Sequence, residues 1–301
     1  MNMVKMTSKR SLFDFWGRSA RYRGCGDSLG LPQSPHRIAL REILKGRKKI
    51  LDLACGDGAN LAFLPAEIDY TGCDCSTAAL ETLMKRVDHG PMTKQTHVGD
   101  VSQLPVESAS QDAVISSYSF EHFLEVPSIL DECARVLRPG GLLVIFGPDY
   151  TAPNTFAPPQ SSLLNRNRLR LLSYTMARIA RKIRHAWGRD KVLFEYVEPL
   201  TLSKVSFQPD HDLTHLTNHR MISKYMSLFG YRQVDLETTV PLPQTLSMRI
   251  LQALGFWGKF GDARVVMVKP EKSFAPRKPK VTERLIHRQP ITMSIPNKSS
   301  Q

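Results

Sequence analysis

No stretch of the 301-residue sequence reaches the roughly 18 consecutive apolar residues that a membrane-spanning helix needs. Residues 1–24 also lack the continuous apolar segment of a secretory signal. Cysteine is scarce: there are five, and an odd number without a signal is most simply explained by reduced thiols. These absences argue against a membrane-spanning or secreted protein, and we expect a cytoplasmic location.

Positive charge is abundant and unevenly distributed. The formal net charge is +13, and three segments carry an excess of Lys and Arg over Asp and Glu: residues 1–50 (12 against 3), 166–191 (9 against 1) and 269–301 (8 against 2). Such segments favour an anionic partner: a phospholipid surface, a phosphorylated substrate or nucleic acid. A basic surface covered by solvent alone is the alternative.

Short apolar runs alternate with helix-like stretches between residues 50 and 146. The pattern predicts strands at 48–53, 70–74, 96–100, 111–119 and 140–146, and a helix at 128–141 that is stopped by Pro139 and the following glycines. Buried strands joined by helices indicate an α/β fold with a parallel, doubly wound sheet covered on both faces.

The first predicted strand runs into a glycine turn, ILDLACGDGAN at residues 50–60. Gly56 and Gly58 would let the backbone approach a ligand, although a short Gly-x-Gly also fits a purely structural turn. The third glycine of a dinucleotide loop and the G-K-[ST] of a triphosphate loop are missing, and Asp52 and Asp57 would repel phosphate. The next strand ends at Asp74, 22 residues beyond Asp52, where a carboxylate would pair with ribose hydroxyls. The turn therefore predicts a ligand with a ribose and a positive charge but no phosphate.

Five motifs in order carry a family resemblance: ILDLACGDGAN, GCD, GDVSQLP, DAVISSYSFEHF and ECARVLRPGGLLVIFGPD. Together they resemble the class I S-adenosylmethionine-dependent methyltransferases, specifically the type 11 methyltransferase domain. The resemblance covers residues 50–149. It departs from the family at Ala54, where glycine is usual and alanine a common variant.

The resemblance implies a Rossmann-like core and a role for each residue of the cofactor site. Asp52 would hold the amides of the turn or the methionyl ammonium, and Asp74 would accept both ribose hydroxyls. Asp100 would accept a hydrogen bond from the adenine amino group, unless it only caps a turn. The other residues implied to contact S-adenosyl-L-methionine are Ala54, Gly56 and Gly58 at its amino acid portion, Val101 on the adenine ring and Ser117 near the methyl group.

Methyl transfer is an in-line displacement, and an acceptor oxygen or nitrogen must also lose a proton. Candidate bases are His122, in FEHF, and His211 or His215, in PDHDLTHLTNH. We favour His215, because family members that act on sugars carry a similar D-x-T-H element. His122 is common in the family beside the site, but it equally fits a structural role at a helix start. Glu121 could support either histidine.

A metal site is not predicted. Cys73 and Cys75 flank Asp74, but two cysteines two residues apart lack the C-x-x-C spacing of zinc sites. Their simplest interpretation is that of small residues at a strand end.

Segments outside the core are expected to determine the acceptor. Residues 163–187 predict a basic amphipathic helix that would lie on an anionic membrane, cover the site or pack on the domain. Residues 231–237 and 263–268 predict an antiparallel hairpin that closes the sheet, with an apolar insert at 245–260 between them. The predicted division is a basic N-terminal segment (1–49), the core (50–150), a basic helical insert (151–209), the remainder of the fold (210–270) and a disordered basic tail (271–301).

The sequence therefore predicts a cytoplasmic methyltransferase, with possible contact with an anionic membrane. Its acceptor would be the oxygen of a small or lipid-linked molecule, such as a sugar of a cell-surface glycan. The alternatives are methylation of a natural product or lipid-like ring, or a methyltransferase-like protein that binds without turnover. Nucleic acid is not the expected partner, because no RNA-binding module is recognisable and GPDY at 147–150 differs from the N-P-P-Y pattern of many nucleic acid methyltransferases.

Overall fold

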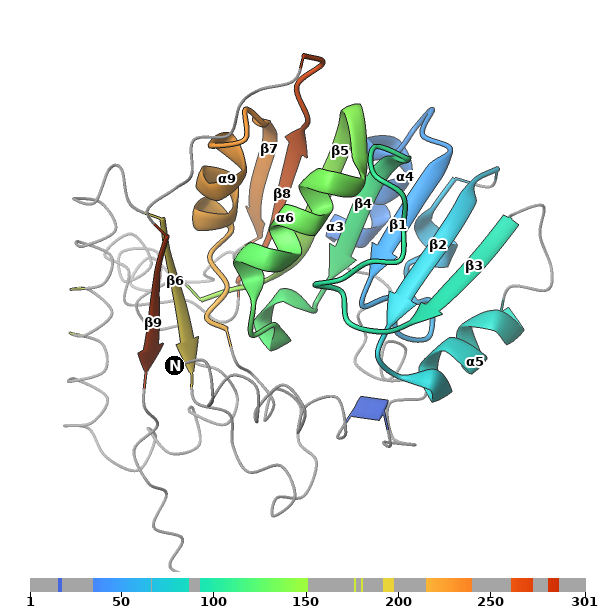
Figure 1. Cartoon of the computed structure of the whole chain (residues 1–301), viewed down its shortest axis with the longest axis horizontal. Helices are drawn as coiled ribbons and strands as arrows, with labels where there is room; N and C mark the ends of the chain where they lie inside the picture. The colour runs from blue at the N-terminus through green and yellow to red at the C-terminus, as the bar shows by residue number, and fades with distance from the viewer. Residues whose placement is uncertain are drawn as a thin grey trace, which may run out of the picture.

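A seven-stranded sheet with the strand order β3-β2-β1-β4-β5-β8-β7 forms the centre of the protein (Figure 1). The structure, a computed structural model, describes residues 16–17, 35–65, 67–86, 93–150, 176, 180, 192–197, 215–239, 261–272 and 281–286. The strands of the sheet are β1 (Lys49–Leu53), β2 (Asp69–Asp74), β3 (Thr93–Val98), β4 (Gln111–Ser117), β5 (Leu137–Asp149), β7 (Arg232–Thr239) and β8 (Gly261–Val268).

Strands β1 to β5 run parallel, and β8 is antiparallel to both of its neighbours, β5 and β7. This confirms the predicted doubly wound α/β sheet with an antiparallel C-terminal hairpin. At the edge where the parallel strands end, Asp149 of β5 pairs with Gly261 of β8, and Thr239 of β7 pairs with Asp262. The chain therefore leaves β5 and β7 and enters β8 at the same edge of the sheet.

Helices cover both faces of the sheet. They are α3 (Pro35–Ile38), α4 (Leu40–Ile43), α5 (Thr77–Arg86), α6 (Val126–Val136) and α9 (His219–Ser227), with 3-10 turns η3 (Leu61–Phe63) and η4 (Phe120–His122). In Figure 1, α6 and α9 lie in front of the sheet, and α3 and α4 lie behind it.

Neighbouring residues of β1 belong to two different hydrophobic clusters, because successive side chains of a strand point to opposite faces. Leu51 and Leu53 pack with residues of α6 and α9, whereas Ile50 packs with Leu40 near the N-terminus and Leu83 of α5. All three β1 leucine and isoleucine side chains are fully buried. Burial on both faces explains why the central strands read as continuous apolar runs.

The predicted boundaries of several elements differ from the observed ones. The helix predicted at 128–141 ends at Val136, because Leu137 is already extended with a ψ of 133°. Proline disfavours helical backbone in the residue before it, so Arg138 could not have continued the helix into Pro139. Strand β5 consequently begins at Leu137, and β3 begins and ends earlier than the predicted 96–100.

A second, two-stranded sheet pairs β6 (Val192–Val197) in parallel with β9 (Val281–Ile286). Both strands differ from the sequence prediction, because β6 lies within the predicted helical insert and β9 within the predicted disordered tail. The two strands lie far apart in the sequence and pair with each other. Local sequence patterns do not reveal so distant a pairing partner. Of the predicted helix at 163–187 the structure describes only Met176 and Ala180, both helical, and the insert at 245–260 lies outside the described residues.

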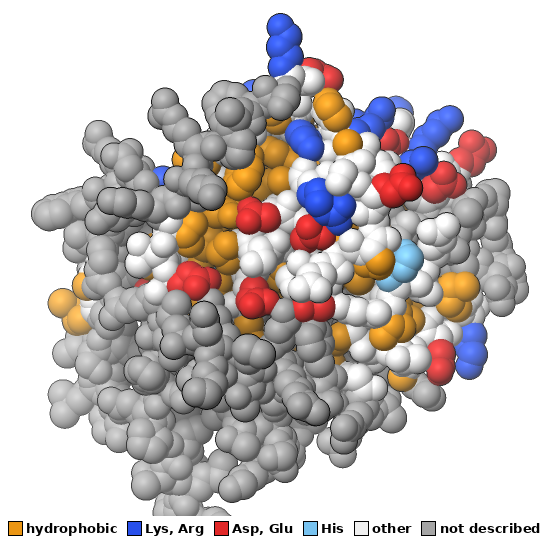
Figure 2. All heavy atoms as spheres, in the orientation of Figure 1, with side chains coloured by type: hydrophobic (Ala, Val, Ile, Leu, Met, Phe, Trp, Pro, Cys, Tyr) orange, Lys and Arg blue, Asp and Glu red, His pale blue; other side chains and the backbone are white. Residues whose placement is uncertain are grey.

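Hydrophobic side chains gather around α6 and α9 on the face that Figure 2 shows, with acidic side chains beside them and most of the basic side chains along the upper and right-hand parts. Val106, Phe123 and Phe229 are partly buried residues that pack against the cluster beneath α6 and α9. None of the helices in the described part of the chain has the length and apolar character to cross a membrane.

Candidate functional site

The glycine turn follows β1 at the point where the strand order reverses. Strand β1 lies between β2 and β4, which are reached by connections that run in opposite directions. In open α/β sheets, ligands bind beyond the carboxyl ends of the strands at this reversal. The residues after β1, β2 and β4 are therefore the ones to examine.

Backbone geometry shapes the turn. Gly58 has a φ of 81°, a left-handed conformation that strains residues with a Cβ atom, and a Cβ there would also lie 2.8 Å from Cδ1 of Leu61 and 3.0 Å from Cγ of Leu83. Ala54 has a φ of 51°, a left-handed conformation that is unfavourable for any residue with a Cβ atom. The departure from the family's usual glycine thus carries a conformational cost at Ala54.

Asp74 ties the turn to the end of β2. Its Oδ2 accepts a hydrogen bond from the Gly56 amide over 2.9 Å, and its Oδ1 accepts one from the Ser76 amide over 2.8 Å. The side chain is buried, and this burial raises the pKa of the Asp74 carboxyl, against the opposing effect of the two amides. Each carboxylate oxygen has a second lone pair, so the group retains capacity to accept hydroxyl hydrogen bonds.

Asp52 lies fully buried beneath the turn. Its two oxygens accept hydrogen bonds from Nδ2 of Asn60 over 3.2 and 3.0 Å, and Oδ2 also accepts one from the Tyr70 hydroxyl over 3.0 Å. Loss of hydration raises the pKa of Asp52 to about 7, although the hydrogen bonds and the charge of Arg37 act in the opposite direction. Asp52 therefore changes charge near neutral pH.

Asn60 links the turn to three elements around it, β1, α3 and β4. Besides its bonds to Asp52, its Oδ1 accepts hydrogen bonds from Nε of Arg37, over 3.0 Å, and from Oγ of Ser117, over 3.1 Å. Sequence analysis predicted Asp52 and Ser117 but missed Asn60, Arg37 and the Tyr70 hydroxyl. Asn60 belongs to the quoted turn motif, yet nothing local distinguishes it from a turn-forming asparagine, and Arg37 belongs to a generally basic segment.

Asp100 and Val101 lie directly after β3, in the loop that leads to β4. The Asp100 carboxylate accepts a hydrogen bond from the Ser102 amide over 2.9 Å, the turn geometry that was the alternative to adenine recognition. The Gly99 amide donates to the Asp74 carbonyl over 2.9 Å, so this loop starts beside the end of β2. The two predicted residues thus follow directly after a contact with the end of β2, and Val101 is buried.

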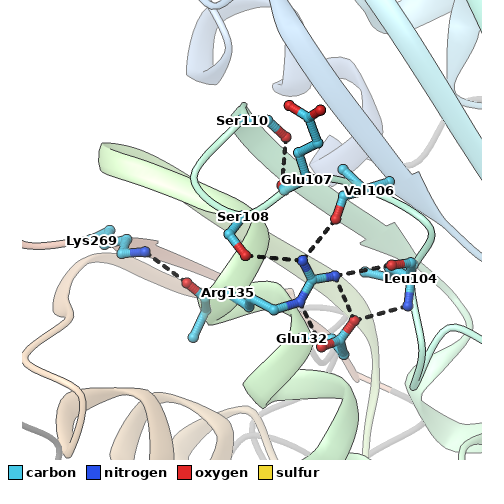
Figure 3. Close-up of polar contacts among 9 residues, drawn as sticks. Leu104, Val106, Glu107, Ser108, Ser110, Glu132, Arg135 and Lys269 are labelled. Carbon is cyan, nitrogen blue, oxygen red and sulfur yellow. Dashed lines mark hydrogen bonds and ion pairs between the residues drawn. The ribbon is translucent and has the colours of Figure 1, made fainter.

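Arg135 of α6 fixes the same loop (Figure 3). Its guanidinium donates to the carbonyls of Leu104 and Val106 over 3.0 and 2.7 Å, and to Oγ of Ser108 over 3.2 Å. Glu132 accepts from Arg135 over 2.8 Å and from the Leu104 amide over 2.9 Å. These hydrogen bonds lower the pKa of Glu132, and the network holds the loop that carries Asp100 and Val101 against α6.

His215 is buried completely. Its Nδ1 lies 3.0 Å from the Phe120 carbonyl, and its ring packs against Phe194 and Tyr196 at centroid distances of 5.8 and 5.5 Å. Burial lowers the pKa of His215 to about 4. The surroundings are those of a core histidine that is neutral at pH 7, and His211, its alternative, lies outside the described residues.

His122 ends η4, directly after β4. About a fifth of its side chain is exposed, and its Nε2 lies 3.9 Å from Oε1 of Glu121. The ring also meets the edge of Trp16 at a centroid distance of 5.8 Å. His122 is therefore the more accessible of the two predicted bases, with a carboxylate beside it.

The side chains at this edge of the sheet suit S-adenosylmethionine. Buried carboxylates at the ends of β1 and β2 suit an ammonium and ribose hydroxyls, and Ser117, at the end of β4, is hydrogen-bonded to Asn60 beside them. Among the described residues, no group of three or more His, Cys, Asp and Glu side chains is arranged to hold a metal ion.

Comparison with known proteins identifies one domain within this chain, which includes Asp52, Asp74, Asp100 and Ser117. Residues 51–145 match the family model described as a methyltransferase domain. The chain is 37% identical over 114 residues to the phthiotriol/phenolphthiotriol dimycocerosates methyltransferase of Mycobacterium leprae, an alignment covering 36% of this chain and 40% of that protein. It is 33% identical over 154 residues to the demethylmenaquinone methyltransferase of Streptomyces avermitilis, covering 49% and 62%. The matches thus span less than two thirds of either relative.

Solved structures share the fold at low sequence identity. One is in a complex of the Haloferax volcanii Trm112 methyltransferase activator with a methyltransferase, with 18% identity, a TM-score of 0.51, and coverage of 87% of this chain and 98% of that one. Another is a SAM-dependent methyltransferase from Thermotoga maritima, with 13% identity, a TM-score of 0.50, and coverage of 87% and 100%. At these identities the likeness is one of fold.

Proposed function

Because residues 51–145 form a class I S-adenosylmethionine-dependent methyltransferase domain, we propose that the chain transfers a methyl group from S-adenosylmethionine to an oxygen of a lipid-linked acceptor. The observation that carries the proposal is the bond between the Gly56 amide and the Asp74 carboxylate. It sets a buried, negatively charged turn beside a carboxylate that can receive ribose hydroxyls, a combination that suits this cofactor and disfavours pyrophosphate.

Each residue of the site has a separate task in this proposal. Asp74 accepts the ribose hydroxyls, Asp52 supports the turn and the ammonium, and Asp100 and Val101 receive the adenine. The cofactor supplies an electrophilic methyl group, and in-line displacement depends mainly on how well the chain aligns the acceptor.

The acceptor hydroxyl also has to lose a proton. His122 suits this task better than His215, because it is partly exposed after β4 and has Glu121 beside it. His215 packs among aromatic rings with a pKa of about 4, so we now assign it a structural role, contrary to the sequence-based preference.

A lipid-linked acceptor is supported by two independent observations. The relatives named above are named for phthiotriol dimycocerosate and menaquinone chemistry, and the basic segments of this chain favour an anionic surface. An acceptor anchored in a membrane by its lipid would account for both the lipid substrates in the relatives' names and the basic segments of this chain. A glycan sugar attached to a lipid carrier remains within this class.

The test is calorimetric titration of the full chain with S-adenosylhomocysteine, with NAD as the control ligand. Saturable binding of S-adenosylhomocysteine alone is expected. Asp74→Asn should weaken it by about tenfold or more, because a hydrogen bond to a charged group contributes roughly 1.5–3 kcal/mol. Asp69→Asn, on the exposed start of the same strand, is the matched control and should bind normally.

Two results would contradict the proposal. Failure of the folded wild-type chain to bind S-adenosylhomocysteine would remove the cofactor assignment. Binding without methyl transfer to lipid extracts, sugar lipids or quinols, with labelled methyl donor, would favour a methyltransferase-like protein that binds without turnover.

A further inference from the structure

Arg37 places a cation at the reversal point of the sheet. Its Nε donates to Oδ1 of Asn60, which follows β1, over 3.0 Å. Its guanidinium carbon lies 5.8 Å from the centroid of the Tyr118 ring, and Tyr118 follows β4. Arg37 therefore spans the residues after β1 and β4, the two strands between which ligands of this fold class bind.

The side chain lies inside the protein. Arg37 is 3% exposed, which is unusual for arginine, because a buried charge is costly unless it is paired and hydrogen-bonded. Its orientation is set by the Asn60 amide on one side and the Tyr118 ring on the other. A planar guanidinium held in this way is suited to bind a carboxylate through two parallel hydrogen bonds.

Three other charged side chains buried at the turn are acidic. Asp52, Asp57 and Asp74 are all buried there. They suit the ammonium and the ribose of the cofactor, but its amino acid portion is a zwitterion that also carries a carboxylate, which these three side chains would repel. A cation at the same place would therefore favour recognition of the whole amino acid portion.

We propose that Arg37 binds the carboxylate of the cofactor's amino acid portion, with Asn60 and Tyr118 holding its guanidinium in position. The inference rests on the proposed function, and it makes the segment around α3 part of the cofactor site. The methyltransferase domain match begins at residue 51, so Arg37 lies outside the matched segment.

A pair of ligands isolates this contact. S-adenosylhomocysteine has the amino acid portion, whereas methylthioadenosine shares the adenine and ribose but lacks it. Arg37→Gln should weaken S-adenosylhomocysteine binding by about 10- to 100-fold, the range for a lost charged hydrogen bond. The affinity for methylthioadenosine should stay within about twofold, because that ligand has no carboxylate.

Arg41→Gln is the matched control. Arg41 donates to the carbonyl of Ala62, also beyond the turn, but its contact is exposed. Its loss should leave both affinities unchanged.

Arg37→Lys keeps the charge without the planar fork, and a several-fold loss specific to S-adenosylhomocysteine is expected. It serves as the test if Arg37→Gln does not fold. Equal weakening of both ligands, or no weakening of either, would overturn the inference and leave the proposed function intact. Failure of the wild-type chain to bind S-adenosylhomocysteine would instead overturn the proposed function, and the inference with it.

Discussion

Asn60 donates hydrogen bonds from Nδ2 to both carboxylate oxygens of Asp52, over 3.2 and 3.0 Å. The pair shows how the turn is held in place. Asn60, within the turn, binds Asp52, the acidic residue of the preceding strand β1. Because both groups are buried, the charge of Asp52 matters to the whole molecule.

Asp52 should make stability fall as pH rises towards neutrality. Its pKa is raised from 3.8 to about 7 in the folded chain, so between these values the folded state binds more protons than the unfolded state. Stability should decline across this window, by up to about 4 kcal/mol for a shift of this size, and level off above it. Asp52→Asn should remove this dependence of stability on pH.

Urea unfolding at pH 5, 6, 7 and 8 measures the effect. Asp69→Asn, at the exposed start of β2, should keep the wild-type pH dependence. An unchanged slope in Asp52→Asn would show that Asp52 does not titrate in this range.

Arg135→Met should destabilise the protein by about 2–3 kcal/mol, because it leaves the carbonyls of Leu104 and Val106 and the Glu132 carboxylate without this donor. Arg138→Met is the control: Arg138 forms a single, half-exposed ion pair with Asp112, and its loss should cost less than about 1 kcal/mol. Chemical denaturation compares the two. Amide hydrogen exchange at residues 101–108 should quicken only in the Arg135 variant, and similar effects of both changes would refute the role of the network.

His215→Ala and His122→Ala should differ in kind. Removing the fully buried His215 ring leaves a cavity between Phe194 and Tyr196, and we expect a loss of about 2–4 kcal/mol in stability. His122→Ala should cost less than about 1 kcal/mol and leave S-adenosylhomocysteine binding intact, while lowering the rate of methyl transfer. Thermal unfolding and single-turnover assays test the two effects. A stable His215→Ala chain with lost turnover would restore His215 as the base.

Ala54→Gly should stabilise the turn slightly, by up to about 1 kcal/mol, since glycine adopts a φ of 51° without steric cost. The same change at Ala79, in α5, should destabilise by roughly that amount, because glycine is a poor helix former. Chemical denaturation of the two variants and the wild type measures whether each change raises or lowers the free energy of unfolding. A destabilised Ala54→Gly chain would mean that the alanine methyl group contributes packing that outweighs the backbone cost.

Much of the fold could be predicted because its signals are local. Strands β1, β2, β4 and β8 are apolar runs bounded by turn residues, and Asp52, Gly56 and Asp74 lie within or directly after them. Their positions follow once the sheet is assigned, since the carboxyl ends of parallel strands share one edge.

The rest depends on contacts between distant residues. Arg37 and Asn60 are 23 positions apart, and nothing in either neighbourhood marks them as partners. The burial of His215 depends on the strand that contains Phe194 and Tyr196, whose own pairing partner is β9, close to the C-terminus. Strand pairing across such separations cannot be deduced from periodicity.

The pairing of Asp149 with Gly261 and of Thr239 with Asp262 has a consequence for evolution and engineering. The chain leaves β5 for residues 151–191, and β7 for residues 240–260, at the edge that carries the glycine turn. We expect that either segment can be replaced without altering the register of β5, β7 or β8. Chimaeras with segments from other methyltransferases should therefore retain the methyl donor and exchange the acceptor, and new specificities can arise by recombination at these two junctions.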